Sequence, residues 1–316
     1  MLKKMMAMKE IFDFITKYKL QGLFLVMLLG CSAKDDSTIL VDKIDYAVQS
    51  MAKDFISMRP MQGFPYQDIT LSEAYYWQGK MAEYLGTEYG GVIGYKTGGH
   101  NVGPTFPTFP PDGIRGLLLD KMIFPSNSSV SLNATMRGFL EADLAFRVKD
   151  DSINEAQNDL EILAGLDAII PFAEVPDPYY EDGTRTVFGT VVSNMGSRFS
   201  FVGEPVLLEA NEIWLEKINN FTYAVHNENG VLIEEGKIKG WYEPLKVVYW
   251  LRDHLLLSGI RLKAGDLLSL GNIGIIRQLH PNSPRGPAYQ SNSFTLSYYG
   301  LSDQSVSVTI NVDRGD

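Results

Sequence analysis

Two acidic residues lie two positions apart in a strand-like stretch, FLEADLAFRV (139–148). With a period of two, Glu141 and Asp143 share one face of that strand, and a row of apolar side chains occupies the other. At a strand rise of about 3.3 Å per residue, their Cα atoms lie roughly 6.6 Å apart. In a cleft, two bare carboxylates would repel by about 2–3 kcal/mol at an effective dielectric near 20. They therefore need protons, a basic partner or a bound cation.

A third acid, Glu174, lies in the apolar run AIIPFAEV (168–175), where an unpaired charge would be costly. Three oxygen donors at positions where apolar residues are expected suit a hard divalent cation, Mg²⁺ or Mn²⁺, with open positions left to water and substrate. The alternative is a solvated strand face with an ordinary salt bridge, and spacing alone leaves both readings open.

Several motifs follow one another in a particular order between Leu71 and Val312. They are GYKTG (94–98), LLLDKMIF (117–124), the E-x-D strand, PFAEV (171–175) and WLRDHLLLSGIRLKAGDLLSLG (250–271). This succession resembles the fumarylacetoacetate hydrolase superfamily, in particular its 2-oxopent-4-enoate hydratase/4-oxalocrotonate decarboxylase branch. None of these motifs is specific alone, and the resemblance rests on their order over some 200 residues.

The resemblance implies an α+β fold, a mixed β-roll or barrel with flanking helices and a helical N-terminal part. The corresponding division of the chain is a signal peptide at 1–30, a tether and helical region at 31–89 and a catalytic domain at 90–316. Relatives in this superfamily assemble as dimers or larger, so a homodimer is an expectation by analogy.

The resemblance also implies roles for single residues. Glu141, Asp143 and Glu174 match the carboxylates that bind one divalent ion, which chelates the 2-oxo acid and stabilises its enolate form. Lys96 matches the lysine beside the substrate, where it steadies negative charge or, with a lowered pKa, shuttles a proton. Asp120 matches an acid that orients Lys96 or a water. The alternative for Lys96 is a surface lysine in a glycine-rich turn. The alternative for Asp120 is the cap of a helix or turn.

Four further residues are candidates for substrate binding. Gln78 matches a polar position in the N-terminal helix of the family, although a solvent-facing position is the alternative. His100 follows GYKTGG directly, and a lone histidine in a loop can equally be a packing residue. Asn194 and Ser197 match a polar run of the family in which the usual acid is replaced here by Ser193. A second departure from the family concerns the metal ligands: Asp143 stands where the family usually has the longer glutamate.

The predicted function is that of a metal-dependent enzyme acting on a small 2-oxo acid or its enol. Hydration of a 2-hydroxy-2,4-dienoate is the reaction expected first, and relatives with the same site decarboxylate oxo-acids or hydrolyse acylpyruvates. The alternative is a non-catalytic envelope lipoprotein that retains the fold to bind a carboxylate ligand or to serve a structural role.

The first thirty residues predict a lipid anchor. Several lysines precede the apolar run LQGLFLVMLL (20–29), which is too short to span a bilayer and ends at Gly30-Cys31. This pattern resembles a bacterial lipobox with Cys31 as the lipid acceptor, and Ser32 favours sorting to the outer membrane. The alternative is a buried N-terminal helix with a chance cysteine. With the anchor, the protein is an envelope lipoprotein facing the periplasm.

The composition narrows the class of protein further. The chain has 316 residues, 45% of them hydrophobic, which suffices for a sizeable core. A net charge of −10 without a basic block argues against nucleic acid as a partner. With a single cysteine, an intramolecular disulfide is excluded.

Helices are expected early and strands later. Helical spacing predicts helices over 36–58, 71–86, 152–165 and 244–258, with Gly86 as a stop and Ser152 as an N-cap. Strand patterns cover 186–192, 200–202, 206–210 and 221–226, Asn229-Gly230 marks a hairpin turn, and the tail 293–312 alternates like a final hairpin.

Overall fold

The computed structural model describes residues 36–99, 110, 113–239, 243–280 and 289–315. The predicted lipid acceptor Cys31 and the candidate His100 lie outside these residues. Among the described helices, none has both the length and the apolar character that crossing a bilayer requires.

Nine of the described strands form a mixed sheet with β5 and β6 at its centre. The order is β2 (Ile114–Leu119), β1 (Val92–Gly98), β11 (Leu267–Ser269), β5 (Phe139–Val148), β6 (Leu166–Val175), β7 (Phe199–Val202) and β3 (Ile123–Pro125). In addition, β12 (Ile273–Gln278) pairs with β5, and β8 (Val206–Leu207) pairs with β6. The long strands β5 and β6 therefore connect the two halves of this sheet.

A second sheet contains five described strands, four of which come from residues 222–313. Its order is β10 (Leu232–Lys237), β9 (Thr222–Asn227), β13 (Ser293–Tyr299), β14 (Val306–Asp313) and β4 (Ser129–Ser131). The β9–β10 hairpin turns at Asn229-Gly230, where Gly230 has the positive φ of 71° that such a turn requires. Strands β13 and β14 contact β6, so the two sheets pack together.

The helices lie around the sheets. They are α2 (Asp36–Ile56), α3 (Leu71–Tyr89), α4 (Asp159–Ala164), α5 (Val187–Val192), α6 (Glu212–Asn220) and α7 (Pro244–Leu257), with short 3₁₀ turns η2 (Asp120–Met122), η3 (Leu132–Ala134), η4 (Asp151–Asn154) and η5 (Asn194–Gly196). Helix α3 begins at a capping box. The Thr70 side chain accepts from the backbone N–H of Glu73, and the Glu73 carboxylate accepts from the backbone N–H of Thr70. Proline at its first turn starts α7.

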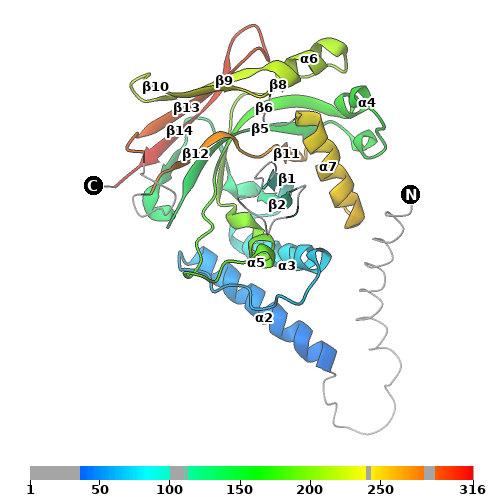
Figure 1. Ribbon diagram of the computed structural model, residues 1–316, viewed down its shortest axis with the longest axis vertical. Helices are drawn as coiled ribbons and strands as arrows, with labels where there is room; N and C mark the ends of the chain where they lie inside the picture. Colours follow the sequence, from blue (N-terminus) through cyan, green and yellow to red (C-terminus); the bar gives the residue numbers. More distant parts are fainter. Residues whose placement is uncertain (1–35, 100–109, 111–112, 240–242, 281–288, 316) are drawn as a thin grey trace.

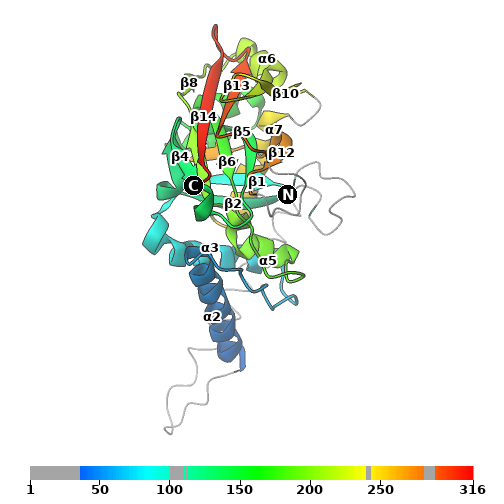
Figure 2. The same cartoon turned by 90° about the vertical axis from the view of Figure 1, so that its left-hand side faces the viewer.

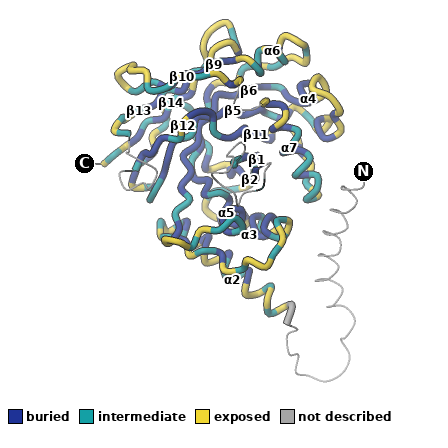
Figure 3. Tube along the Cα trace, viewed as in Figure 1, coloured by how far each residue is buried: buried dark blue, intermediate teal, exposed yellow. Residues whose placement is uncertain are grey.

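The described chain is elongated, with the two sheets at one end and the N-terminal helices at the other (Figures 1 and 2). Helices α3 and α5 contact β2, and α2 packs on the outer side of α3. Helix α7 contacts β1. The burial map shows a continuous buried centre along β5 and β6, whereas exposed residues gather on α2, α6 and the loops (Figure 3).

The predicted α+β class with a curled sheet and flanking helices is confirmed, and several local predictions are wrong. Residues 187–192 form α5 and not a strand, because Thr186 caps the helix by accepting from the Gly189 backbone. The expected helix over 152–165 is split into η4 and α4, with Asn158 as the cap of α4. Helix α3 runs past Gly86 to Tyr89, and α6 was not expected.

Candidate active site

The register of β5 and β6 places the three predicted carboxylates on one face. Glu141 pairs directly with Glu174, and Asp143 pairs with Phe172 two positions further along. Directly paired residues of an antiparallel sheet point their side chains to the same side. Glu141, Asp143 and Glu174 therefore share one face, as the sequence predicts for the first two.

Strands β1 and β11 bring the predicted lysine to the same face. Lys96 pairs with Ser269, and Ser269 pairs in turn with Ala145, two residues after Asp143 on β5. Lys96, Ser269 and Ala145 thus form one row across the sheet, and Asp143 stands in the next row. The centre of the sheet thus brings together four residues that span 78 positions of sequence: Lys96, Glu141, Asp143 and Glu174.

Lys96 and Glu174 form a buried ion pair, with side chains only 3% and 2% exposed. The second carboxylate oxygen of Glu174, Oε1, is buried and accepts no hydrogen bond from the described residues. Burial disfavours the charged lysine, but Glu174, Glu141 and Asp143 outweigh it and raise the pKa of Lys96 above its usual value. Lys96 is therefore an ammonium ion at neutral pH, and the lowered pKa that proton shuttling would need is not found.

Asp143 is completely buried and is held by three contacts. Its Oδ1 accepts from the backbone N–H of Leu144 at 2.6 Å, and its Oδ2 accepts from the hydroxyl of Ser269. Its backbone carbonyl accepts from the hydroxyl of Tyr298 at 2.6 Å. Burial and the charge of Glu174 raise the pKa of Asp143 well above its usual value, against the opposing effect of Ser269, Leu144 and Lys96.

The donor set suits a divalent cation, although it is not already arranged as a coordination sphere. In the part of the chain that the structure describes, no three His, Cys, Asp or Glu side chains are placed to hold a metal ion together. The charges of three carboxylates nevertheless act on a single ammonium, and one buried oxygen of Glu174 is left without a donor among the described residues. Both features fit a hard cation with two positive charges, which Glu141, Asp143 and Glu174 are the predicted residues to hold.

A glycine, Gly116, and an asparagine, Asn194, shape the space around Lys96. A Cβ at Gly116, which pairs with Lys96, would lie 2.9 Å from the lysine Cγ. Asn194 has a positive φ of 56°, and its side chain accepts from the N–H of Leu117 at 2.7 Å and donates to the carbonyl of Leu117 at 2.9 Å. Because both amide atoms of Asn194 are used in this way, it supports β2, and the structure does not place it as the predicted substrate contact.

The other polar candidates are buried. Gln78 on α3 is 0% exposed, which excludes the solvent-facing alternative, and its Nε2 donates to the carbonyls of Arg115 and Val191, both at 2.8 Å. Its Oε1 has no hydrogen-bond partner among the described residues. Ser197 is buried and its backbone N–H donates to the carbonyl of Asn194. Substrate binding by Gln78 and Ser197 stays a prediction.

The predicted role of Asp120 is contradicted. Asp120 is exposed and begins η2 directly after β2. Lys96 pairs with Gly116, whereas Val92, at the far end of β1, pairs with Leu119. Asp120 therefore lies at least four residues, or about 13 Å, from Lys96 along the strands. At that distance it cannot orient the lysine or a water bound to it.

Sequence reasoning missed two residues of the site, Ser269 and Tyr298. Ser269 is the one polar residue in the run LLSL (267–270) and is completely buried. A buried serine in an apolar strand needs a hydrogen-bond partner, which is a usable signal, but the sequence does not say that the partner is Asp143. Tyr298 lies in the expected final hairpin, where nothing in the local pattern indicates contact with β5.

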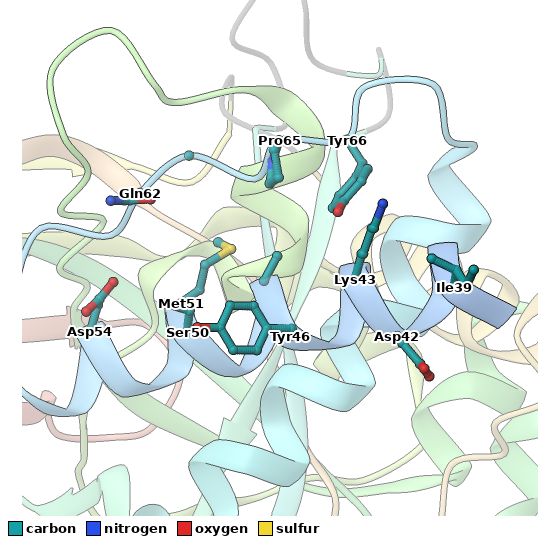
Figure 4. Close-up of a pocket in the computed structure, with 12 residues that line it drawn as sticks. Ile39, Asp42, Lys43, Tyr46, Ser50, Met51, Asp54, Gln62, Pro65 and Tyr66 are labelled. Atoms are coloured by element: carbon teal, nitrogen blue, oxygen red, sulfur yellow. The ribbon is translucent and has the colours of Figure 1, made fainter. Parts of the chain in front are cut away.

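A separate cavity of about 590 Å³ lies between α2 and the loop 62–66 (Figure 4). Tyr46, Met51 and Asp54 line it from α2, and Gln62 and Tyr66 line it from the loop. The carboxylate and lysine residues of the sheet take no part in its lining. The candidate site and this cavity are therefore different places.

The comparisons with known proteins agree with the fold. No family model matches the chain. A solved structure of 4-oxalocrotonate decarboxylase from Pseudomonas putida G7, complexed with calcium and acetate, superposes with a TM-score of 0.69 at 20% identity, covering 86% of this chain and 98% of the decarboxylase. The chain has a fumarylacetoacetate hydrolase-like fold. The magnesium and adipate complex of the same enzyme superposes with a TM-score of 0.67 at 19% identity, again covering 86% and 98%.

Curated proteins similar in sequence to this chain are enzymes. The 4-oxalocrotonate decarboxylase of Pseudomonas sp. (strain CF600) is 24% identical over 240 residues, 75% of this chain and 84% of the relative. The 2-hydroxypent-2,4-dienoate hydratase of Pseudomonas putida is 25% identical over 231 residues, 71% of this chain and 99% of the relative. Decarboxylases and hydratases are thus both among its relatives.

Proposed function

We propose that this protein is a metal-dependent enzyme that acts on a small 2-oxo acid or its enol. The observation that carries the proposal is the meeting of Glu141, Asp143, Glu174 and Lys96 on one face, with a buried oxygen of Glu174 left unpaired in the described structure. The fold neighbours that contain calcium or magnesium with a carboxylic acid support it.

The residues of this chain have distinct tasks in such a reaction. Glu141, Asp143 and Glu174 hold a divalent ion, Mg²⁺ or Mn²⁺, which when bound supplies Lewis-acid polarisation of the substrate oxygens. The ammonium of Lys96, freed from Glu174, steadies the negative charge of the carboxylate or enolate. The buried surroundings exclude bulk water and strengthen these interactions.

Hydration of a 2-hydroxy-2,4-dienoate is the reaction we propose, on the support of the hydratase relatives. Decarboxylation of an unsaturated oxo-acid is the second candidate, because the 4-oxalocrotonate decarboxylase fold neighbour is matched over 98% of its length. Both reactions pass through the same enolate, so the carboxylate and lysine residues alone do not separate them.

Calorimetric titration of the full chain tests the site. We expect Mg²⁺ and Mn²⁺ to bind, oxalate to bind only in their presence, and Glu141→Ala to abolish both signals. The matched control is Glu204→Ala, which removes an exposed glutamate from a loop. Oxalate binding that persists in Glu141→Ala would contradict the proposed site.

An activity screen with 2-hydroxydienoates and oxo-acids, each with and without metal, then tests the reaction. Metal-dependent consumption of a dienoate supports hydration, and release of CO₂ from an oxo-acid supports decarboxylation. Metal and oxalate binding without any turnover would overturn the enzyme proposal and favour the alternative, an envelope protein that retains the fold to bind a carboxylate ligand.

We also propose that the protein is a lipoprotein of the bacterial cell envelope, attached through Cys31, facing the periplasm and sorted to the outer membrane. The support is the order of lysines, apolar run and Gly30-Cys31 in the sequence. The first described element, α2, begins five residues after Cys31. A homodimer remains a proposal by analogy with relatives.

A further inference from the structure

The carboxylate of Asp143 is held from a neighbouring strand by a residue that no motif indicates. Ser269 on β11 pairs with Ala145 on β5, which makes Asp143 its diagonal neighbour on the same face. Diagonal neighbours stand roughly 7–8 Å apart at the backbone, within reach of a serine hydroxyl and a carboxylate when the residue between them is small. Ala145 is that small residue, and the Ser269 hydroxyl donates to Oδ2 of Asp143.

The rest of Asp143 is fixed by two other contacts. The hydroxyl of Tyr298, from β13 of the second sheet, donates to the Asp143 backbone carbonyl at 2.6 Å and approaches the carbonyl of Phe172, the pairing partner of Asp143, at 3.4 Å. The N–H of Leu144 occupies Oδ1 at 2.6 Å. With its backbone and one oxygen held, the remaining freedom of Asp143 is the tilt of the carboxylate plane, which the bond from Ser269 removes.

These hydrogen bonds leave the carboxylate able to bind a cation. An ionised carboxylate has about four acceptor positions, and Leu144 and Ser269 use one on each oxygen. Asp143 and Ser269 are both completely buried. If the Ser269 hydroxyl is removed, bulk water therefore cannot readily replace it as a donor to Asp143.

We propose that Ser269 is a positioning residue, which orients the Asp143 carboxylate so that it can ligate the divalent ion. This proposal rests on the proposed metal-dependent function. In this role Ser269 acts through its hydrogen bond to Asp143 and is not itself a ligand of the ion. Partners that orient metal ligands typically change metal affinity about 10- to 100-fold when they are removed.

Titration of the full chain with Mg²⁺, followed calorimetrically, tests this role in four proteins: wild type, Ser269→Ala, Asp143→Asn and the double variant. We expect Ser269→Ala to raise the Kd for Mg²⁺ about 10- to 100-fold relative to wild type. In the Asp143→Asn background the same change should alter the Kd less than about twofold, because the carboxylate that Ser269 orients is already gone.

The control is Thr135→Val, which removes a buried hydroxyl that donates at 3.2 Å to the carbonyl of Leu132 and not to a carboxylate. An equal loss of affinity in Thr135→Val, or in the double variant relative to Asp143→Asn, would mean general destabilisation and would overturn the role of Ser269. A wild-type Kd retained within twofold in Ser269→Ala would overturn it as well, while the metal-site proposal stands. Absence of Mg²⁺ binding in wild type would instead overturn the proposed function itself.

Discussion

Replacing Lys96 by methionine should destabilise the metal-free protein, because it leaves Glu174 as a buried charge without its counter-ion. The side chains of this pair are 3% and 2% exposed, and breaking such a pair typically costs about 3–5 kcal/mol. At about 2 °C per kcal/mol for a chain of this size, the Tm should fall by about 6–10 °C. The raised pKa of Lys96 means that its contribution is complete below its unfolded-state pKa and is lost only as the pH rises through the folded value.

Circular dichroism melting at pH 7 with a chelator measures this loss, and Lys246→Met is the matched control. Lys246 pairs with Glu243 on the surface, with side chains 72% and 64% exposed, so its removal should change the free energy of unfolding by less than about 1 kcal/mol.

Excess Mg²⁺ should then restore part of the stability of Lys96→Met. The ion would take over the neutralisation of Glu174, with about 2.7 kcal/mol available at a concentration of 100 Kd. Equal Tm losses in the two lysine variants, or a smaller Mg²⁺ effect in Lys96→Met than in wild type, would refute the reasoning.

Three further predictions follow from the same contacts. Because the folded pKa of Asp143 is raised, metal-free wild type should lose stability as the pH rises from about 4, the unfolded-state pKa, through the raised folded value. Asp143→Asn should flatten this profile in urea unfolding and weaken Mg²⁺ binding, and an unchanged slope would contradict a raised pKa. Gly116→Ala should cost about 1–3 kcal/mol and reduce turnover at least about tenfold, because the new Cβ displaces Lys96, whereas Gly91→Ala, whose Cβ meets no described atom within 4 Å, should do neither. Cys31→Ser should move the protein from the membrane to the soluble fraction on cell fractionation, and unchanged membrane partition would refute the anchor.

Patterns of a few residues already predict much of this fold. Alternation along 139–148 marks β5, and Asn229-Gly230 marks the β9–β10 turn, because strands and tight turns follow from local side-chain periodicity and backbone preference. The apolar run 168–175 lies within β6. The same periodicity places Glu141 and Asp143 on one face. Local patterns predicted segment 187–192 wrongly, because its β-branched residues favour a strand. The cap at Thr186 and the packing of α5 on α3 stabilise a helix there instead.

Only the tertiary structure decides which residues of the site meet. The sequence supplies Lys96, Glu141, Asp143 and Glu174 as chemically suitable groups, but the pairing of Lys96 with Glu174 depends on the register of β1, β11, β5 and β6. The register likewise moves Asp120 away from the lysine. Strand pairing is a contact between distant parts of the chain, and its register is set by how the buried faces fit together, which no local pattern contains. The same long-range pairing brings Ser269 to Asp143.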